Sequence, residues 1–343
     1  NEIFIASAVP DVNNTCEFKI EDLLKDIVYS SLIESNELLV PVDGMSATYT
    51  LTLKGGTSEQ VVNLSGSCFT GGAAKNELRK FTGINLLETF KIQNGTGNFF
   101  LTTRTQKNVL TLRESEIYPL YFVHPGGTIK IEDSSENTIT LPAGEARKPY
   151  ALNLPIVRKQ FLEAGTLSNY FKVYVNNIEA CSVVLTPAVD TDDRYLLQFK
   201  NSYGAYERIE VTGLPSLESK YDSSTAQFNK YDYDIKDFTS ASGRVKSTRT
   251  IKTHSGYKAP EEIQFINDLL ASDDIYLLTT NADLFNVLVT AQKIEQKLLF
   301  CKDPESIQLN IQFIDKDSNN TPHVIGNTIS NRIFSVQFDN TFN

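Results

Sequence analysis

Short apolar runs separated by turn residues dominate the chain and predict strands rather than helices. Val, Ile, Thr, Tyr and Phe gather in runs that Gly, Asn, Asp and Pro interrupt, which is typical of strands joined by turns. In the clearest run, residues 306–315, polar residues alternate with four apolar ones: Ile307, Leu309, Ile311 and Phe313. One face of this strand is therefore apolar and the other polar, as in a half-buried strand of an antiparallel sheet.

A second pattern, in residues 195–213, predicts a hairpin. The same alternation places one set of apolar residues on a face of each strand: Tyr195, Leu197 and Phe199, then Ile209 and Val211. The four-residue loop Asn201-Ser202-Tyr203-Gly204 joins them. Asn and Gly adopt positive φ readily, so this loop can close the hairpin.

Helical patterns are few. Residues 260–271 begin with Pro260 and two glutamates and then carry one apolar stripe: Ile263, Ile266, Leu269 and Leu270. Proline and acidic residues favour a helix start, and the stripe predicts that the helix packs on a sheet. In residues 20–34 the apolar spacing is mixed and β-branched residues weaken the pattern, so helix and non-helix both stay open there.

A chain of 343 residues exceeds one ordinary core, and its pattern divides into three segments. Residues 1–116 form an N-terminal β domain with strands expected at 48–53 and 99–103. Residues 117–190 have strands at the spacing of an immunoglobulin-like β-sandwich. Residues 191–343 form a C-terminal β domain with one short helix and an extended C-terminal arm. The expected fold class is mainly β, a multi-domain set of antiparallel β-sandwiches.

Charge and cysteine spacing exclude several functions. The net charge is −10 and basic residues do not cluster, which argues against nucleic acid as a partner. Every apolar stretch is shorter than the roughly 18 residues of a membrane span, so no membrane span is expected. The cysteines, Cys16, Cys68, Cys181 and Cys301, lie too far apart for metal-ligand pairs or a dense disulfide framework, and free thiols are favoured.

Catalytic patterns are not recognisable in the sequence. The histidines, His124, His254 and His323, have no second His or Cys at metal-ligand spacing. Glu114 and Glu116 form a carboxylate pair, but glycosidase chemistry depends on a separation in space that a sequence does not give. We therefore expect a protein that is not an enzyme and has no catalytic residues, cofactor or metal.

Aromatic residues in polar surroundings are the candidate interaction sites. The loop of the 195–213 hairpin either simply closes a sheet or presents Tyr203 and Tyr206 to an adjacent subunit. The connector at 221–238 contains Tyr231 and Tyr233, which favour an ordered arm or subunit contact and, as the alternative, a platform on which sugars stack.

The C-terminal tail also has an interaction pattern. From Asn319 onward it is rich in Asn and Thr, and it ends in a strand-like stretch that contains Phe334, Val336 and Phe338. A strand behind a polar linker predicts an exchanged or added strand in an assembly.

Four stretches, taken in order, resemble a family of proteins encoded by phages and prophage-like elements of Bacteroidetes. They are FTGGAAKNELRKF at 69–81, GNFFLTTRTQKNVLTLRESEIYPLYFVHPGG at 97–127, FKNSYGAYERIEVTG at 199–213 and THSGYKAPEEIQFINDLLASDDIYLL at 253–278. The resemblance spans residues 45–315. It departs where His254-Ser255-Gly256 replaces the family's Thr-Gly lead into a helix, and in the tail after Asp315.

The resemblance implies a structural component of a virion, in the tail or baseplate and related in role to distal tail proteins. It carries over no catalytic residues. The implied partners are further copies of the chain, which form a ring or collar, and other tail proteins. The implied location is the virion tail outside the cell, after synthesis in the host cytoplasm. The alternative, from the aromatic connector, is a surface-exposed β-sandwich module that binds a host glycan or host protein.

Overall fold

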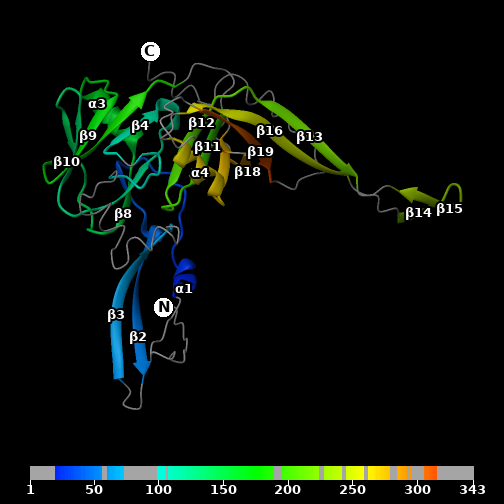
Figure 1. The fold of residues 1–343 in the computed structure, drawn as a ribbon, viewed down its shortest axis with the longest axis horizontal. Coiled ribbons are helices and arrows are strands. Elements are labelled where there is room, and N and C mark those ends of the chain that lie inside the picture. Colours follow the sequence, from blue (N-terminus) through cyan, green and yellow to red (C-terminus); the bar gives the residue numbers. More distant parts are fainter. Residues whose placement is uncertain are drawn as a thin grey trace. The chain divides into compact units, whose positions relative to one another are not determined.

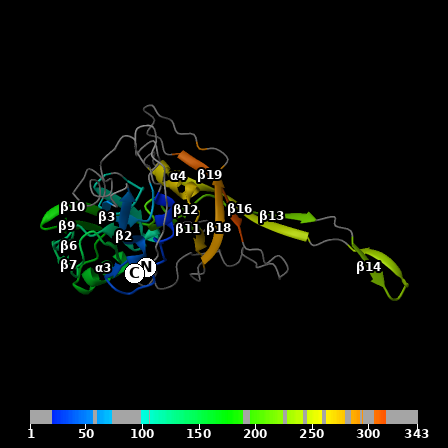
Figure 2. The same ribbon diagram turned by 90° about the horizontal axis from the view of Figure 1, so that it is seen from below.

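The computed structural model describes residues 20–55, 60–72, 99–105, 107–188, 195–223, 228–241, 245–258, 262–278, 284–291, 294 and 305–314. Over these residues the protein is mainly β and consists of several antiparallel sheets with few helices (Figures 1 and 2). The fold class expected from the strand pattern is confirmed.

The contacts divide the chain into two compact units that interleave along the sequence. Unit 1 comprises Asn1–Thr111, Tyr118–Val184 and Asn201–Tyr206, and unit 2 comprises Leu112–Ile117, Leu185–Lys200 and Glu207–Asn343. The three-domain division, with an immunoglobulin-like middle, stays a prediction.

Unit 1 contains a three-stranded sheet of order β1-β8-β5 and most of a five-stranded sheet of order β4-β10-β9-β6-β7. Its central strands bury their apolar residues, as Val173 and Phe171 show at 1% exposure each. The strands are β1 (Leu39–Pro41), β4 (Val109–Arg113), β5 (Leu120–Val123), β6 (Ile129–Asp133), β7 (Thr138–Thr140), β8 (Pro149–Leu152), β9 (Tyr170–Val175) and β10 (Ile178–Thr186).

The described residues of the first half of the chain include two helices and two 3-10 turns. Helix α1 (Glu21–Lys25) covers only the start of the 20–34 candidate. Helix α3 (Leu154–Glu163) was not predicted; its buried Phe161 stacks on Phe171 of β9, with ring centroids 5.7 Å apart. The 3-10 turns are Asp43–Met45 and Glu114–Glu116.

The prediction of a strand at residues 99–103 is wrong. This segment is irregular and buried, and the amide of Thr102 bonds back to the Phe100 carbonyl at 2.9 Å. Phe99 and Phe100 are consecutive, yet both rings lie close to the ring of Phe122, at 5.0 and 6.3 Å. A strand would send consecutive side chains to opposite faces, so packing both phenylalanines in one cluster requires a bent backbone.

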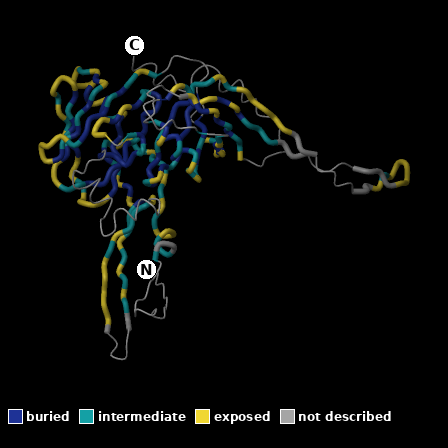
Figure 3. The backbone as a smooth tube through the Cα atoms, in the orientation of Figure 1, coloured by how far each residue is buried: buried dark blue, intermediate teal, exposed yellow. Residues whose placement is uncertain are grey.

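Strands β2 (Ser46–Gly55) and β3 (Gln60–Phe69) form a hairpin that is its own two-stranded sheet. Their antiparallel register runs without a break from Ser46 opposite Phe69 to Gly55 opposite Gln60. The expected strand at 48–53 is confirmed within β2. In Figure 3 the described part of this hairpin is intermediate or exposed along its length, in contrast to the dark blue interior strands.

Unit 2 is organised around a seven-stranded sheet of order β12-β11-β17-β18-β19-β16-β13. Every pair of neighbours for which the register is known, from β11 to β13, is antiparallel. The strands are β11 (Tyr195–Lys200), β12 (Tyr206–Val211), β13 (Ser216–Ser223), β16 (Val245–Lys258), β17 (Ile275–Leu278), β18 (Leu284–Ala291) and β19 (Glu305–Phe313).

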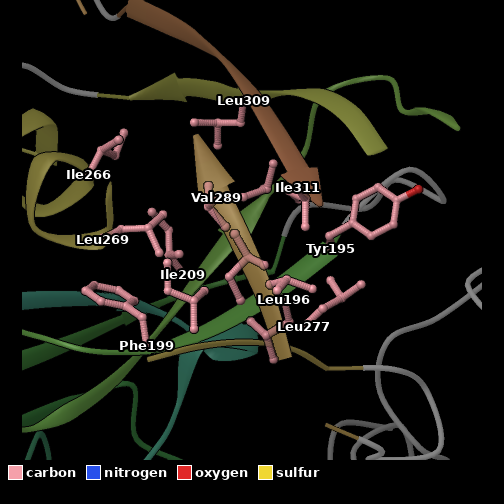
Figure 4. Packing of buried hydrophobic residues seen from close by; sticks show 14 of the residues in the cluster. Tyr195, Leu196, Phe199, Ile209, Ile266, Leu269, Leu277, Val289, Leu309 and Ile311 are labelled. Atoms are coloured by element: carbon pink, nitrogen blue, oxygen red, sulfur yellow. The ribbon is translucent and has the colours of Figure 1, made fainter. Parts of the chain in front are cut away.

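The core of unit 2 lies between this sheet and helix α4 (Ile263–Ala271). Leu309 and Ile311 of β19 are fully buried, which confirms the alternation expected at 306–315. The expected helix is confirmed from Ile263 to Ala271, and so is its packing on the C-terminal sheet; residues 260–261 lie outside the described residues. Figure 4 shows Ile266 and Leu269 of α4 beside the side chains of the sheet strands.

A second hairpin, β14 (Phe228–Asp232) with β15 (Asp237–Ala241), also forms a two-stranded sheet of its own. The register places Asp232 opposite Asp237, and residues 233–236 form the turn. Lys236 adopts a positive φ of 53° at the end of this turn. The exposed tip is yellow in Figure 3.

Candidate interaction surfaces and a buried polar cluster

The loop of the 195–213 hairpin is held by the side chain of Asn201. Its Oδ1 accepts hydrogen bonds from the amides of Tyr203 and Ala205, both at 3.0 Å. Its Nδ2 donates to the Leu101 carbonyl at 2.8 Å. The Asn201 side chain therefore satisfies two backbone amides of the turn. It also holds the loop to Leu101, which is distant in sequence but belongs to the same unit.

Glycines make the other close contacts of this loop. Gly204 has a φ of +80°, and a Cβ there would lie 2.4 Å from Thr70 Oγ1. A Cβ on Gly71 would lie 2.4 Å from the Ser202 carbonyl oxygen. The amide of Gly72 also donates to that oxygen at 2.9 Å. The loop thus fits closely against residues 70–72 of the same unit.

The two tyrosines predicted from this loop differ in exposure. Tyr203 is partly exposed, whereas Tyr206 is 3% exposed and interacts with Tyr121 inside unit 1. Burial, together with the neighbouring Tyr118 and Tyr206, raises the pKa of Tyr121. A subunit contact by Tyr203 stays a prediction, and Tyr206 has almost no surface with which to make one.

The tip of the β14–β15 hairpin places the other two predicted tyrosines together at the surface. Tyr231 and Tyr233 are 39% and 83% exposed, and their rings meet edge to face with centroids 5.1 Å apart. Ile235 in the same turn is 61% exposed. The amide of Asp234 donates to Asp232 Oδ1 at 2.9 Å, which fixes the turn. The tip is therefore an aromatic and apolar surface bordered by carboxylates.

The remaining predicted contact residues, Phe334, Val336 and Phe338, lie outside the residues that the structure describes. The exchanged or added C-terminal strand stays a prediction.

Unit 2 contains a buried polar cluster that was not predicted from the sequence. Glu116, in the turn Glu114–Glu116, accepts hydrogen bonds from the amides of Glu210 at 2.8 Å and Arg113 at 3.2 Å. Ser115 Oγ donates to the Glu210 carboxylate. Lys258 Nζ donates to the Glu210 carbonyl at 3.1 Å. Ser115, Glu116, Glu210 and Lys258 are all at most 3% exposed.

Arg208 extends this cluster along β12. Its Nε donates to Gln198 Oε1 at 2.9 Å and its Nη1 donates to the Ile117 carbonyl at 3.2 Å. Charged groups are buried at low cost only when they are paired and hydrogen-bonded. Because a substrate has no access to side chains this buried, the cluster best explains how the turn Glu114–Glu116 is fixed to β12. Glu116 and Glu210 lie 94 residues apart in the chain, so no local sequence pattern predicts the cluster.

His124 is a buried histidine that hydrogen-bonds to the backbone. His124 is 1% exposed and its Nδ1 accepts from the Gly126 amide at 3.1 Å. Burial lowers the pKa of His124. Among the residues that the structure describes, no group of three or more His, Cys, Asp and Glu side chains could hold a metal ion.

Within the described ranges, no helix is both long enough and apolar enough to cross a lipid bilayer. Comparison with known proteins finds neither a family model nor a curated sequence that matches the chain.

Proposed function

We propose that this protein is a non-catalytic structural subunit of a phage or phage-like particle, located in its tail or baseplate. Copies of the chain assemble there into a ring or collar and contact other tail proteins. The ordered sequence stretches of 69–278 that resemble phage and prophage proteins motivate the assignment to a particle.

The observation that carries the proposal is the presence of two hairpins, β2–β3 and β14–β15, each of which forms a sheet of two strands. Both expose apolar side chains, such as Leu64 at 51% and Tyr233 at 83%. An isolated two-stranded hairpin is marginally stable in water, and exposed apolar patches mark interaction sites. Two-stranded sheets that expose apolar side chains among the described residues are therefore suited to contacts with other chains.

The stretch FKNSYG at 199–204 supports a structural role for the resembling residues. Asn201 and Gly204 are the residues that this turn requires, because Asn201 binds two amides of the loop and Gly204 has a positive φ. Their use is explained by folding alone and calls for no bound substrate.

Purified particles test this proposal directly. An antibody against the chain, used in immunogold electron microscopy of particles released from the host that encodes it, is expected to label the tail or baseplate. Mass spectrometry of the same particles should find the chain in several copies per particle. Particles that carry no label and no peptide of the chain would contradict the proposal.

A module that binds a host glycan or host protein is the second candidate, and the tyrosine pair of β14–β15 favours it. Tyr233 is 83% exposed beside Tyr231, and aromatic rings of this kind stack on sugars. Tyr233→Ala is the informative variant, and Lys236→Ala, at another exposed position of the tip, is its control. Retention of a glycan by the wild type and by Lys236→Ala, but not by Tyr233→Ala, would support this candidate; no retention by any of them would remove it.

A further inference from the structure

The seven-stranded sheet of unit 2 has two edge strands, β12 and β13, which differ in what lies beside them. The edge of β12 is occupied, because the amide of Glu210 donates to the Glu116 carboxylate at 2.8 Å. No strand among the described residues lies along the outer edge of β13 (Figure 1). An open edge presents amide donors and carbonyl acceptors that can pair with a further strand. The sheet can therefore accept an eighth strand next to β13.

A row of core side chains crosses this sheet and ends at β13 in an exposed residue. Residues directly opposite in an antiparallel pair lie on the same face. The registers of four neighbouring strands place one residue of each strand in the same row: Val289, Ile311, Ile251 and Leu217. The first three are at most 2% exposed, whereas Leu217 is 51% exposed. An apolar residue beside Leu217 on a further strand would continue the row and remove the Leu217 side chain from water.

The opposite face of the β13 edge is polar. Glu218 lies opposite Thr250, and Thr250 lies opposite Gln312. The Glu218 carboxylate also pairs with Lys252 at the surface. Because successive side chains of a strand point to opposite faces, a strand that fits this edge needs an apolar residue at every second position and a polar residue between them.

The C-terminal stretch, residues 334–338, has this pattern. Its apolar residues, Phe334, Val336 and Phe338, alternate with the polar Ser335 and Gln337. The stretch contains no charged side chain, so it can approach a chain of net charge −10 without repulsion between like charges. Residues 334–338 lie outside the described part of the chain, and the match is between their sequence and the two faces of the β13 edge.

The length of chain before the C-terminal stretch favours a partner edge on another copy. The 19 residues 315–333 separate the stretch from Ile314, the last described residue. On the same copy, the position outside β13 is three strand spacings from β19, or about 14 Å, which about five extended residues would span. Connections inside a compact unit have a median of about four to six residues. The longer connection can instead reach about 60 Å, far enough for a neighbouring copy.

The two surfaces of this contact are different, which determines the kind of assembly that it builds. A contact between unlike surfaces repeats from head to tail and forms a ring when its rotation closes. Each copy then uses its β13 edge once and its C-terminal stretch once. This arrangement produces the ring or collar that the proposed function requires.

We infer that the C-terminal stretch of one copy adds to the open edge of β13 in the next copy, with its apolar residues on the face of Leu217. The inference rests on the proposed function, because that function supplies the neighbouring copy, and it names the contact that joins the copies. Leu217 becomes buried on assembly, while Glu218 and Lys252 stay in contact with water.

Sedimentation velocity of the full chain over a range of concentrations tests the inference with a matched pair of variants on each surface. Leu217→Lys places a charge on the apolar side of the edge, and Leu214→Lys, at an exposed leucine before β13, is its control. Val336→Lys places a charge among the apolar residues of the C-terminal stretch, and Ser335→Lys is its control. A lysine on the apolar side of an edge opposes strand addition, so Leu217→Lys and Val336→Lys should each raise the concentration at half-assembly by about tenfold or more. The controls should change it by less than about threefold.

An equal mixture of Leu217→Lys and Val336→Lys tests the head-to-tail arrangement. Each variant alone lacks one of the two surfaces at every contact and should stay monomeric. In the mixture, the intact C-terminal stretch of Leu217→Lys can occupy the intact edge of Val336→Lys, and no further contact can follow. Dimers that grow no larger are therefore expected. A mixture without dimers would overturn the inference, because the stretch would then pair within its own chain or with another surface.

A folding control completes the experiment. Far-UV circular dichroism should show the edge variants folded, since Leu217 and Leu214 are 51% and 78% exposed already. Equal effects of each variant and its control, with a wild type that still assembles, would overturn the inference and leave the proposed function intact. A wild type that stays monomeric would also overturn the inference, and the labelling of particles decides the proposed function separately.

Discussion

Two parts of the chain show the same alternation of apolar and polar residues but bury their apolar faces to different degrees. In β19, Leu309 and Ile311 are fully buried in a cluster that includes α4. In β3, Leu64 is 51% exposed. A period of two residues establishes that one face of a strand is apolar. It does not establish whether the same chain or another chain covers that face.

The largest expected effect contrasts these two leucines. Leu309→Ala should lower the free energy of unfolding by about 3 kcal/mol, because the loss of buried methyl groups and the remaining cavity both destabilise. Leu64→Ala should lower it by less than about 1 kcal/mol, because half of that side chain is already in water. Urea unfolding followed by circular dichroism measures both. Equal losses would mean that β2–β3 is covered within the single chain.

The second-largest expected loss of stability comes from the buried polar cluster. Glu116→Ala removes the acceptor of two backbone amides, those of Glu210 and Arg113, and should cost about 2 to 3 kcal/mol of unfolding free energy. Glu116→Gln keeps one acceptor oxygen and should cost less. Glu163→Ala is the control, since its pairing with Lys159 lies at the surface. The same urea titration separates these variants, and a neutral Glu116→Ala would contradict the assignment of the cluster to folding.

A smaller effect is expected in the loop that joins β11 to β12. Gly204→Ala introduces a Cβ at positive φ and close to Thr70, which should cost about 1 to 2 kcal/mol. Gly72→Ala is the matched control, because nothing lies within 4 Å of a Cβ there. Thermal unfolding should show a lower midpoint for Gly204→Ala alone. Equal midpoints for both variants would show that the loop is not tightly held.

The smallest effect is a dependence on pH from His124. Burial lowers its pKa in the folded protein, so between that pKa and about 6.5 the unfolded chain binds more protons. The contribution of His124 is therefore complete above pH 6.5 and is lost as the pH falls, with a slope of at most about 1.4 kcal/mol per pH unit. Stability measured from pH 7 to pH 5 should fall less steeply in His124→Gln. An identical slope in both proteins would contradict this assignment.

The local pattern of apolar residues was sufficient to predict those elements whose apolar face is covered by the same chain. The strand at 306–315 and the helix at 260–271 were predicted because both have apolar residues in a single register. Helix α3 was missed although Leu154, Val157 and Phe161 lie at helical spacing, because β-branched residues and short strands dominate its surroundings. Residues 99–103 were predicted as a strand because their composition suits one, but the packing of two adjacent phenylalanines bends the backbone.

The candidate sites were predictable only in part. Tyr231 and Tyr233 could be found as aromatic residues in a polar connector, and both are at the surface. The apolar face of β2–β3 had a sequence signal that was not used, namely alternation without charge in residues 61–69. The cluster of Glu116 and Glu210 had none, because its members are distant in sequence and meet only in the folded unit.

The central claim is that this chain acts by assembling with copies of itself. Electron microscopy of the purified full-length protein, at the highest concentration at which it stays in solution, tests that claim most directly. The account predicts closed rings or collars with one repeating subunit. Fields of single, separate copies at every concentration would contradict it.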